Sequence, residues 1–153
     1  MSSFSYSVLT TLPRDRVRGV LTDIANWPRF SDIYSDLHWE GMPWAEGSEL
    51  VGRLNYPLLI YGRYVIKKCD PPALIRYLSR TRNAGFATER TIILEQLTKG
   101  TLIRAESYVV GKPEMVGGAA EFLKGLTTRW LNELARFCDN EALSIADSHG
   151  DTE

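Results

Sequence analysis

The strongest constraint on the fold is an amphipathic segment near the end of the chain, residues 115–140, which reads MVGGAAEFLKGLTTRWLNELARFCDN. Its apolar residues recur at spacings of three and four, which at roughly 100° per residue places them in one stripe along a helix. The stripe consists of Ala119, Phe122, Leu123, Leu126, Trp130, Leu134 and Phe137. A helix of this length needs a broad apolar surface to cover its stripe, and the rest of the chain must supply that surface.

The preceding residues read mainly as strands. Phe4, Tyr6 and Val8 alternate with serines, which is the period of a half-buried strand. A short helix follows from Pro13, because apolar residues recur at helical spacing up to Ile24. A second short turn is expected after it. Antiparallel strands are then predicted over residues 33–40 and 49–56, on either side of a turn at 70–73, and over 86–97 and 102–110.

Two hairpins are specific enough to predict strand register. Asp70–Ala73 is a proline-rich turn, and the first hairpin around it has these pairs: Cys69 with Leu74, Lys67 with Arg76, Ile66 with Tyr77, Tyr64 with Ser79, and Arg63 with Arg80. A two-residue turn at Lys99–Gly100 gives the second hairpin these pairs: Glu95 with Arg104, Leu94 with Ala105, Ile92 with Ser107, and Arg90 with Val109. Glu95 and Arg104 are expected outside, and the other three pairs inside.

The order of five motifs resembles a known superfamily. The motifs are Asn26-Trp27-Pro28-Arg29-Phe30 after the first helix, Gly47-Ser48 before a strand, Asp70-Pro71-Pro72, Lys99-Gly100-Thr101, and the final helix. Together they resemble the START-like, or SRPBCC, superfamily, the helix-grip group that includes polyketide cyclases and dehydrases, coenzyme Q-binding proteins and lipid-transfer domains. The pattern predicts an α+β fold in which a curved antiparallel sheet of about seven strands wraps around the long C-terminal helix, with two short helices after strand one. One such domain is expected over residues 1–142, followed by a flexible tail over 143–153.

The resemblance implies a cavity between the sheet and the long helix that holds an apolar or amphipathic small molecule. The inner faces supply an apolar wall with a few hydroxyl groups, which is the composition of a ligand pocket. The residues expected to bind the ligand are Trp27, Phe30, Tyr64, Tyr77, Ser79, Arg90, Ile92, Ser107, Phe122, Leu126 and Trp130. The alternative is a core that side chains fill completely.

Two charged residues on these elements have more than one interpretation. Arg90 on the inner face must be paired or hydrogen-bonded, so it either anchors a ligand carboxylate or phenolate or pairs with an acidic side chain of the chain itself. A register displaced by one residue would instead place Arg90 outside. Glu133 stands four residues after Arg129 and three before Arg136, which favours a surface ion pair over a catalytic acid.

Four aromatic residues are candidates for the cavity mouth. Trp27 and Phe30 are expected to pack beside it, while Trp39 and Trp44 are either part of the core or a mobile lid. Acid and base chemistry could be carried by Tyr64, by Tyr77, or by either of the two charged residues above, and the sequence does not choose among them. The catalytic residues, if there are any, are therefore unknown.

Charge and residue types exclude several classes of protein. With 153 residues and a net charge of −1, the chain is one domain without a global basic field, so no nucleic-acid partner is expected. The first residues lack the charged and apolar regions of a signal peptide and no apolar run reaches membrane length, which predicts a cytoplasmic protein. The two cysteines are expected to stay reduced. The two histidines form no ligand set and no phosphate-binding loop is present, so neither metal nor cofactor is expected.

A local basic patch is the exception to this neutral balance. Its members are Arg63, Lys67, Arg76, Arg80 and Arg82, all expected on the outer face of the first hairpin. Neighbouring carboxylates such as Glu89 would neutralise the patch; otherwise it would bind an anionic partner. Binding or transport of a hydrophobic or amphipathic small molecule, such as a lipid, a polyketide or an isoprenoid-like compound, is the function the sequence favours. A polyketide cyclase or dehydrase-like enzyme and a protein-interaction module using the basic outer face are the alternatives.

Overall fold

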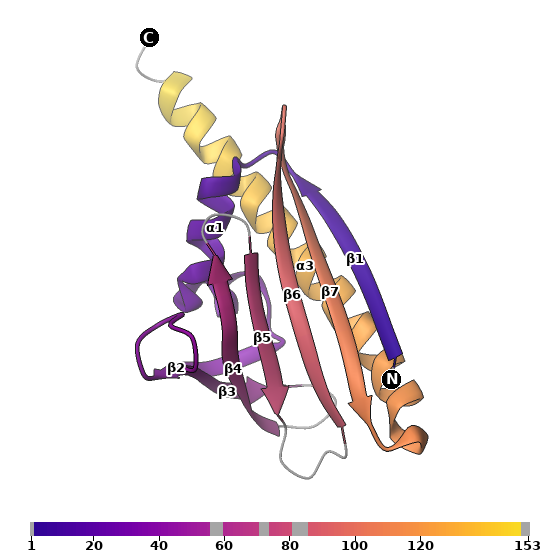
Figure 1. Cartoon of the computed structure of the whole chain (residues 1–153). Helices are drawn as coiled ribbons and strands as arrows, with labels where there is room; N and C mark the ends of the chain where they lie inside the picture. Colours follow the sequence, from indigo (N-terminus) through magenta and orange to yellow (C-terminus); the bar gives the residue numbers. More distant parts are fainter. Residues whose placement is uncertain (1, 56–59, 71–73, 81–85, 151–153) are drawn as a thin grey trace.

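The computed structural model describes residues 2–55, 60–70, 74–80 and 86–150, without the side chains of 74–80 and of some residues beside the gaps. The described elements follow one another as β1 (Ser2–Thr10), α1 (Arg14–Thr22), η1 (Ile24–Asn26), α2 (Trp27–Phe30), β2 (Tyr34–Glu40), β3 (Glu49–Leu54), β4 (Ile60–Asp70), β5 (Leu74–Arg80), β6 (Phe86–Leu97), β7 (Gly100–Gly111) and α3 (Pro113–Gly150). Figure 1 shows the short helices and α3 on one side of the sheet. The predicted α+β class, with a curved antiparallel sheet and a long C-terminal helix, is confirmed.

The strands form one antiparallel sheet in the order β1-β7-β6-β5-β4-β3-β2. The chain therefore places its first and last strands side by side, and β1 and β2 are the two edges. In Figure 1, β2 and β3 cross the lower end of the sheet at a steep angle to β6 and β7. This curvature makes the concave face that the helices cover.

The helix α3 runs diagonally across the concave face and packs mainly on β1, less on β7 and least on β6. The short helices lie on the same face, where α1 contacts β6 and β7, and η1 and α2 contact β2. Val17 and Leu21, one helical turn apart on α1, are fully buried there. The core thus has a helix-covered half and a half filled by the aromatic side chains described below.

Two features of α3 differ from the sequence-based prediction. The helix continues past residue 142, where the tail was expected to begin, and ends at Gly150. Its buried residues are Val116, Ala120, Thr127, Trp130, Leu131, Leu134, Ala135 and Cys138. This stripe is rotated by about one residue from the predicted one, which leaves Phe122 at 39% exposure. Small residues, Ala120 and Ala135, lie on the buried side of the rotated helix.

The predicted register of the second hairpin is wrong by two residues. The loop consists of Thr98 and Lys99, and Gly100 already pairs with Leu97. Gly100 has φ +114°, and neither loop residue has a positive φ. That pattern is typical of a type I turn followed by a left-handed glycine rather than of a primed turn. The observed pairs replacing the four predicted ones are Glu95 with Leu102, Leu94 with Ile103, Ile92 with Ala105 and Arg90 with Ser107.

A shift of two residues keeps every side chain on its predicted face. Ile92 and Leu94 are 1% and 3% exposed and face inward as expected. In the first hairpin the pairs of Arg63 with Arg80, Tyr64 with Ser79 and Ile66 with Tyr77 are confirmed. Nearer the turn a bulge between Ile66 and Lys68 displaces the pairing by one. Leu74 therefore pairs with Asp70 instead of Cys69, and Arg76 pairs with Lys68 instead of Lys67.

Candidate functional site

The interior contains a buried guanidinium, that of Arg90 on β6, which is 8% exposed. Its Nη2 donates to Thr127 Oγ1 of α3 at 2.5 Å. Its Nε and Nη1 donate to Ser107 Oγ of β7 and to the Tyr34 hydroxyl of β2, each at 3.4 Å. Three hydroxyl groups from three elements thus surround one cation, where β6, β7, β2 and α3 meet. The inward orientation excludes the displaced register that would have put Arg90 outside.

These contacts suit an anchor for a polar group. A guanidinium has five N–H donors in a planar fork and no acceptor, so every partner must supply an oxygen or another acceptor atom. Hydroxyl groups are neutral partners, and the two 3.4 Å contacts are long for hydrogen bonds. A carboxylate or phenolate oxygen would make shorter, charge-assisted bonds with the same donors.

Aromatic rings surround Tyr34 on the side away from the guanidinium. Its ring centroid lies 5.6 Å from that of Trp27, 6.0 Å from that of Tyr64 and 6.2 Å from that of Trp130. Trp27 and Trp130 meet edge to face at 5.2 Å, and Phe30 extends the cluster at 5.5 Å from Trp130. Tyr34 therefore joins a polar group to a large apolar surface, since its hydroxyl contacts Arg90 while its ring belongs to the cluster.

A narrow hollow adjoins this cluster, and at no point is it wide enough to hold a water molecule. Its lining residues are Trp27, Trp44, Leu50, Tyr64 and Ile66. Trp44 covers it from the β2–β3 connection, half-buried, with its indole N–H donating to the Thr22 carbonyl oxygen at 2.6 Å. The ring also packs edge to face on Trp39 at 4.8 Å. Trp44 has φ +62°, a conformation that costs energy for a bulky residue.

The structure brings most of the predicted site residues together in the interior. Those that are buried are Trp27, Phe30, Tyr64, Arg90, Ile92, Ser107 and Trp130. Leu126 is half-buried, and Phe122 lies mostly on the surface. The side chains of Tyr77 and Ser79 lie outside the described residues.

Sequence reasoning did not identify Tyr34 and Thr127, although both contact Arg90. Thr127 is 1% exposed and stands four residues after Leu123 and three before Trp130. A hydroxyl at that position of an apolar stripe signals a buried polar partner. Tyr34 is the second residue of the run predicted as a strand from residue 33, and its inward direction follows only from the register of β2 with β3.

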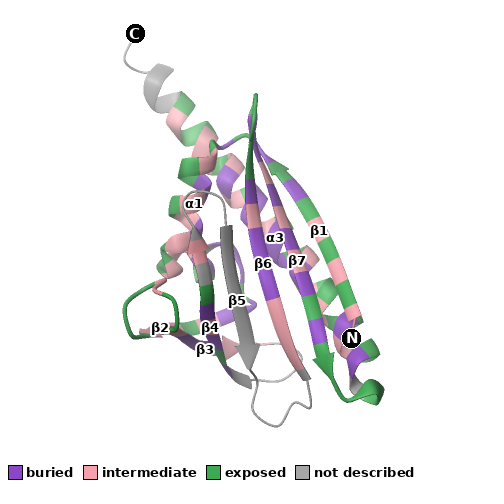
Figure 2. Cartoon of the chain, viewed as in Figure 1, coloured by how far each residue is buried: buried purple, intermediate pink, exposed green. Residues whose placement is uncertain are grey.

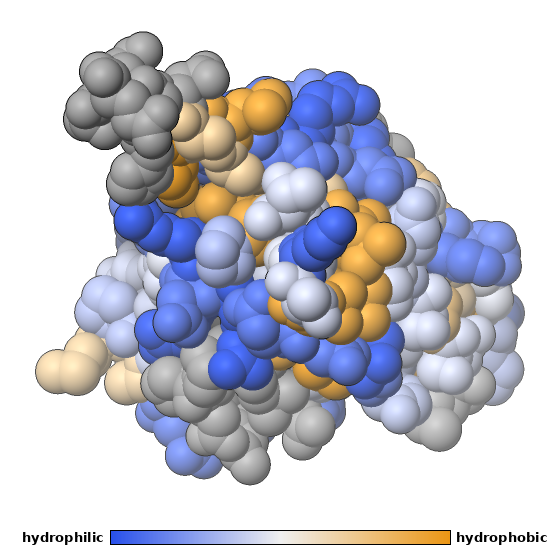
Figure 3. Space-filling model, turned by 90° about the horizontal axis from the view of Figure 1, so that it is seen from above, coloured by the Kyte–Doolittle hydropathy of each residue, from blue (hydrophilic) through white to orange (hydrophobic). Residues whose placement is uncertain are grey.

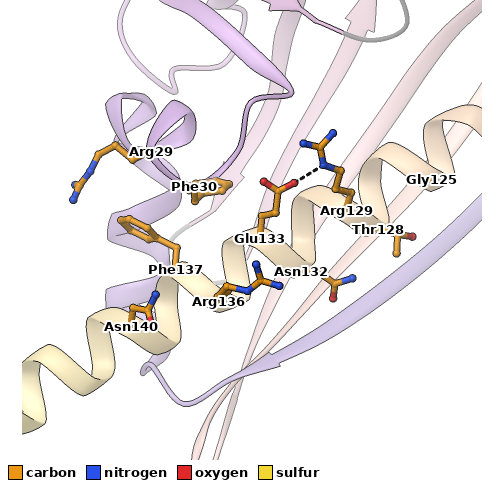
Figure 4. A pocket seen from close by; sticks show the side chains of 10 residues that line it. All are labelled: Arg29, Phe30, Gly125, Thr128, Arg129, Asn132, Glu133, Arg136, Phe137 and Asn140. Atoms are coloured by element: carbon orange, nitrogen blue, oxygen red, sulfur yellow. Dashed lines mark ion pairs between the residues drawn. The ribbon is translucent and has the colours of Figure 1, made fainter.

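A second depression, a groove of about 710 Å³, follows the outer face of α3 beside α2 (Figure 4). The ion pair of Arg129 with Glu133 lies along it, with Nε and Oε1 2.7 Å apart. Arg129 also pairs with Asp32. At its α2 end the Arg29 guanidinium lies 5.1 Å from the centre of the Phe137 ring. The predicted Glu133 ion pair is thus confirmed with Arg129, and this half-buried carboxylate lines the groove rather than the interior cluster.

Two members of the predicted basic patch, Arg63 and Lys67, have side chains that the structure describes. Arg63 pairs with Glu40 at 2.5 Å and with Glu49 at 2.6 Å. These hydrogen-bonded carboxylates raise the pKa of Arg63 above its usual value. Lys67 is exposed. The side chains of Arg76 and Arg80, and the whole of Arg82, lie outside the described residues.

Two kinds of feature are absent from the described residues. No helix there is long and apolar enough to cross a membrane. In the same part of the chain, no group of histidine, cysteine and carboxylate side chains is arranged to hold a metal ion.

Comparison with known proteins gives structural matches only. No protein-family model matches the chain, and no curated protein matches its sequence. The crystal structure of CalU16 from Micromonospora echinospora is 19% identical, with a TM-score of 0.63 over 98% of this chain and 84% of that one. The di-domain ARO/CYC StfQ from the steffimycin biosynthetic pathway is 16% identical, with a TM-score of 0.75 over 92% of this chain and 51% of that one. This chain therefore spans about half of StfQ.

A plant enzyme structure matches over nearly its whole length. A point mutant of norcoclaurine synthase from Thalictrum flavum, in complex with a transition-state analogue, is 14% identical, with a TM-score of 0.69 over 92% of this chain and 96% of that one. At such low identity these matches establish the fold. The chain has a helix-grip fold, which is the fold that the resemblance in its sequence motifs implies.

Proposed function

We propose that this protein binds a hydrophobic or amphipathic small molecule between the sheet and α3, with the polar end of the ligand at Arg90 and its apolar body against the aromatic cluster. The observation that carries the proposal is the buried guanidinium of Arg90, held by the hydroxyl groups of Ser107, Tyr34 and Thr127. A buried cation beside a large aromatic surface is an expensive arrangement for a core that only has to be stable. It suits a ligand with one anionic end.

The shape of the ligand follows from the neighbours of Tyr34. The rings of Trp27 and Trp130 lie within 6.2 Å of the Tyr34 ring, and the hydroxyl of Tyr34 is the side of the cluster nearest to Arg90. Faces and edges of indole rings favour flat apolar molecules. A fused or extended aromatic compound with a carboxylate or phenolate at one end therefore matches the arrangement better than an alkyl chain does.

Entry of a ligand requires side chains to move, because the hollow beside the cluster does not admit even a water molecule. Trp44 is the side chain best placed to move. It is half-buried, lies on a connection rather than in a strand, and has a backbone conformation that stores strain. Rotation of Trp44 away from Trp27 joins the hollow to the solvent, so the predicted lid role belongs to this residue.

One observation favours an enzyme of the cyclase or dehydrase type as a second candidate. The Tyr34 hydroxyl accepts a hydrogen bond from Arg90, and such a phenol next to a cation is a suitable proton donor to a carbonyl oxygen. StfQ belongs to a biosynthetic pathway, and norcoclaurine synthase binds a transition-state analogue. The interaction-module alternative is weakened, because Arg63 at the edge of the basic patch already has two carboxylate partners.

The test compares an acid with its ester. A flat aromatic carboxylic acid and its methyl ester are titrated into the protein, and binding is followed by the quenching of tryptophan fluorescence. The acid is expected to bind more tightly, and Arg90→Met is expected to weaken its binding about 10- to 100-fold, as for the loss of one hydrogen bond to a charged group. Affinity for the ester should change little.

A matched control uses a surface arginine. Arg104 on β7 pairs with Glu106 at 3.2 Å on the outer face, so Arg104→Met should leave binding unchanged. Equal affinity of the acid for wild type and Arg90→Met would refute the anchoring role. Mass spectrometry after incubation with a linear polyketone acid separates the two candidates, because a carrier returns this compound unchanged whereas a cyclase or dehydrase joins two of its carbons in an aldol reaction and releases the carbonyl oxygen as water.

A further inference from the structure

The strand β1 is an edge strand of the sheet, and α3 packs on the face of β1 that carries Phe4 and Tyr6. The strand has β7 on one side only, and the two strands pair without a register shift from Ser2 to Thr10. Natural proteins normally guard an exposed edge with a charged side chain, a proline, a bulge, a very short strand, or a helix or loop that covers it. The nine residues SSFSYSVLT include no charge, no proline and no glycine. The unpaired backbone groups of β1 are therefore a regular template for another strand.

The opposite edge of the sheet, β2, is protected against the addition of another strand. A register shift between Ser35 and His38 interrupts β2, and Asp36 within it has φ +53°. The Asp36 carboxylate is paired with Arg53 at 2.8 Å. A bulge and charges therefore block strand addition at β2, whereas none of these devices is present at β1.

The sequence of β1 is close to symmetric about Tyr6. Moving outward from Tyr6 in both directions, the residue pairs are Ser5 and Ser7, Phe4 and Val8, Ser3 and Leu9, and Ser2 and Thr10. In an antiparallel pair of two copies centred on Tyr6, each residue would meet the other member of its pair. Aromatic Phe4 would then lie opposite β-branched Val8 on the inner face, a favourable cross-strand combination, and Ser5 would lie opposite Ser7 on the outer face.

We propose that β1 pairs with β1 of a second copy of this chain, forming a two-fold symmetric dimer with one continuous sheet. The exposure of the β1 side chains supports a second copy of this chain as the partner. Phe4 and Tyr6 are only half-buried, while Ser3, Ser5 and Ser7 are exposed and small enough to leave the edge open, an alternation visible along β1 in Figure 2. A symmetric interface needs a self-complementary surface, and the near-palindrome supplies one, whereas an unrelated peptide would gain nothing from it.

The edge is also held in place for pairing. The Tyr6 hydroxyl donates to Asn132 Oδ1 of α3 at 3.3 Å. At the end of the strand the Thr10 hydroxyl and the Thr11 N–H donate to Asp139 Oδ1 at 2.7 Å and 3.0 Å. These bonds fix β1 against α3 before a partner arrives, which lowers the entropy lost on association. The net charge of −1 opposes self-association only weakly.

Two double variants test the register as well as the surface. Ser5→Lys with Ser7→Lys places like charges opposite each other twice in the dimer, whereas Ser5→Lys with Ser7→Glu places opposite charges there. We expect sedimentation at low salt to give twice the mass of one chain for wild type, the single-chain mass for the Lys/Lys variant and the doubled mass again for the Lys/Glu variant. His38→Lys on the β2 edge is the control and should leave the dimer intact.

Each outcome decides for or against the interface. A wild-type protein that sediments as one chain at every concentration overturns the proposal, whether or not the variants fold. A Lys/Lys variant that is folded by circular dichroism and still dimeric assigns the association to another surface and also overturns it. A Lys/Glu variant that stays monomeric while folded would contradict the register centred on Tyr6.

Discussion

Replacing Thr127 by valine removes one hydroxyl from the interior and keeps the shape and the helix propensity nearly unchanged. Thr127 is 1% exposed, and its Oγ1 accepts a hydrogen bond from the Arg90 guanidinium at 2.5 Å. The variant leaves a charged donor without this partner in a buried site. Such a loss costs about 1–3 kcal/mol of the free energy of unfolding. For a chain of this size each kcal/mol lowers Tm by about 2–4 °C.

The assay is urea unfolding followed by circular dichroism, with Thr128→Val as the matched control. Thr128 is the next residue on α3 and faces the outer groove, so its replacement should change the free energy of unfolding by less than about 0.5 kcal/mol. Repeating Thr127→Val in an Arg90→Met background should abolish most of its cost, because the donor is then absent. A Thr127→Val variant as stable as the Thr128→Val control would refute the view that Arg90 depends on this bond.

Two other predictions concern a glycine pair and a buried thiol. Gly100→Ala should prevent folding or lower the free energy of unfolding by more than about 3 kcal/mol, because Gly100 has φ +114° and a Cβ there would collide with the Thr10 carbonyl oxygen. Gly125→Ala should instead stabilise α3 by up to about 1 kcal/mol, because a Cβ at Gly125 would meet nothing within 4 Å. Thermal unfolding of both variants checks this. Burial raises the pKa of Cys138 from 9.0 to about 12, so the thiol loses its proton at a lower pH in the unfolded chain than in the folded one. The buried neutral thiol therefore contributes its full stability below pH 9, and this contribution is lost as the pH rises toward 12. Between pH 9 and about 10.5 the wild type should lose roughly 1–2 kcal/mol more than Cys138→Ala in urea unfolding, and parallel losses would contradict it.

The sequence predicts which face each strand buries more reliably than it predicts strand pairing. Alternation along β6 places Ile92, Leu94 and Arg90 inside, and this holds in the structure because the period of two is unaffected by a shift of two residues. The pairing itself depends on backbone angles. Gly100 could have been the second residue of a primed turn or the residue after a type I turn, and both patterns place a glycine after a lysine.

Only part of the candidate site could be predicted from the sequence, because the strand pattern indicates the face on which a residue lies but not its partners. The inward position of Arg90 follows from the strand pattern, but its partners come from β2, β7 and α3, and only the folded chain brings them together. Tyr34 illustrates the limit: its hydroxyl reaches Arg90 although the two residues are 56 positions apart. The exposure of Phe122 has a physical cause of the same kind, since helical spacing defines a stripe but the packing partner sets its rotation.

Some large apolar side chains lie on the surface, outside the core. Leu9, Leu97 and Leu143 are the large apolar side chains that the ends of β1, β6 and α3 leave exposed. Figure 3, which views this end of the molecule, shows orange apolar surface in separate areas between hydrophilic residues. Apolar surface divided in this way is normal for a globular protein, and it gives no reason to place a binding site there.

The position of β1 between β7 and α3 has a consequence for synthesis of the chain. Ser2 pairs with Val109 and Thr10 with Thr101, and Asp139 accepts hydrogen bonds from Thr10. The first strand therefore has no native neighbour until the last strand and most of the final helix have left the ribosome. At about 5–20 residues per second this delay lasts roughly 5–30 seconds. Folding is then late and rich in long-range contacts, so β1 remains without its native partners throughout most of synthesis.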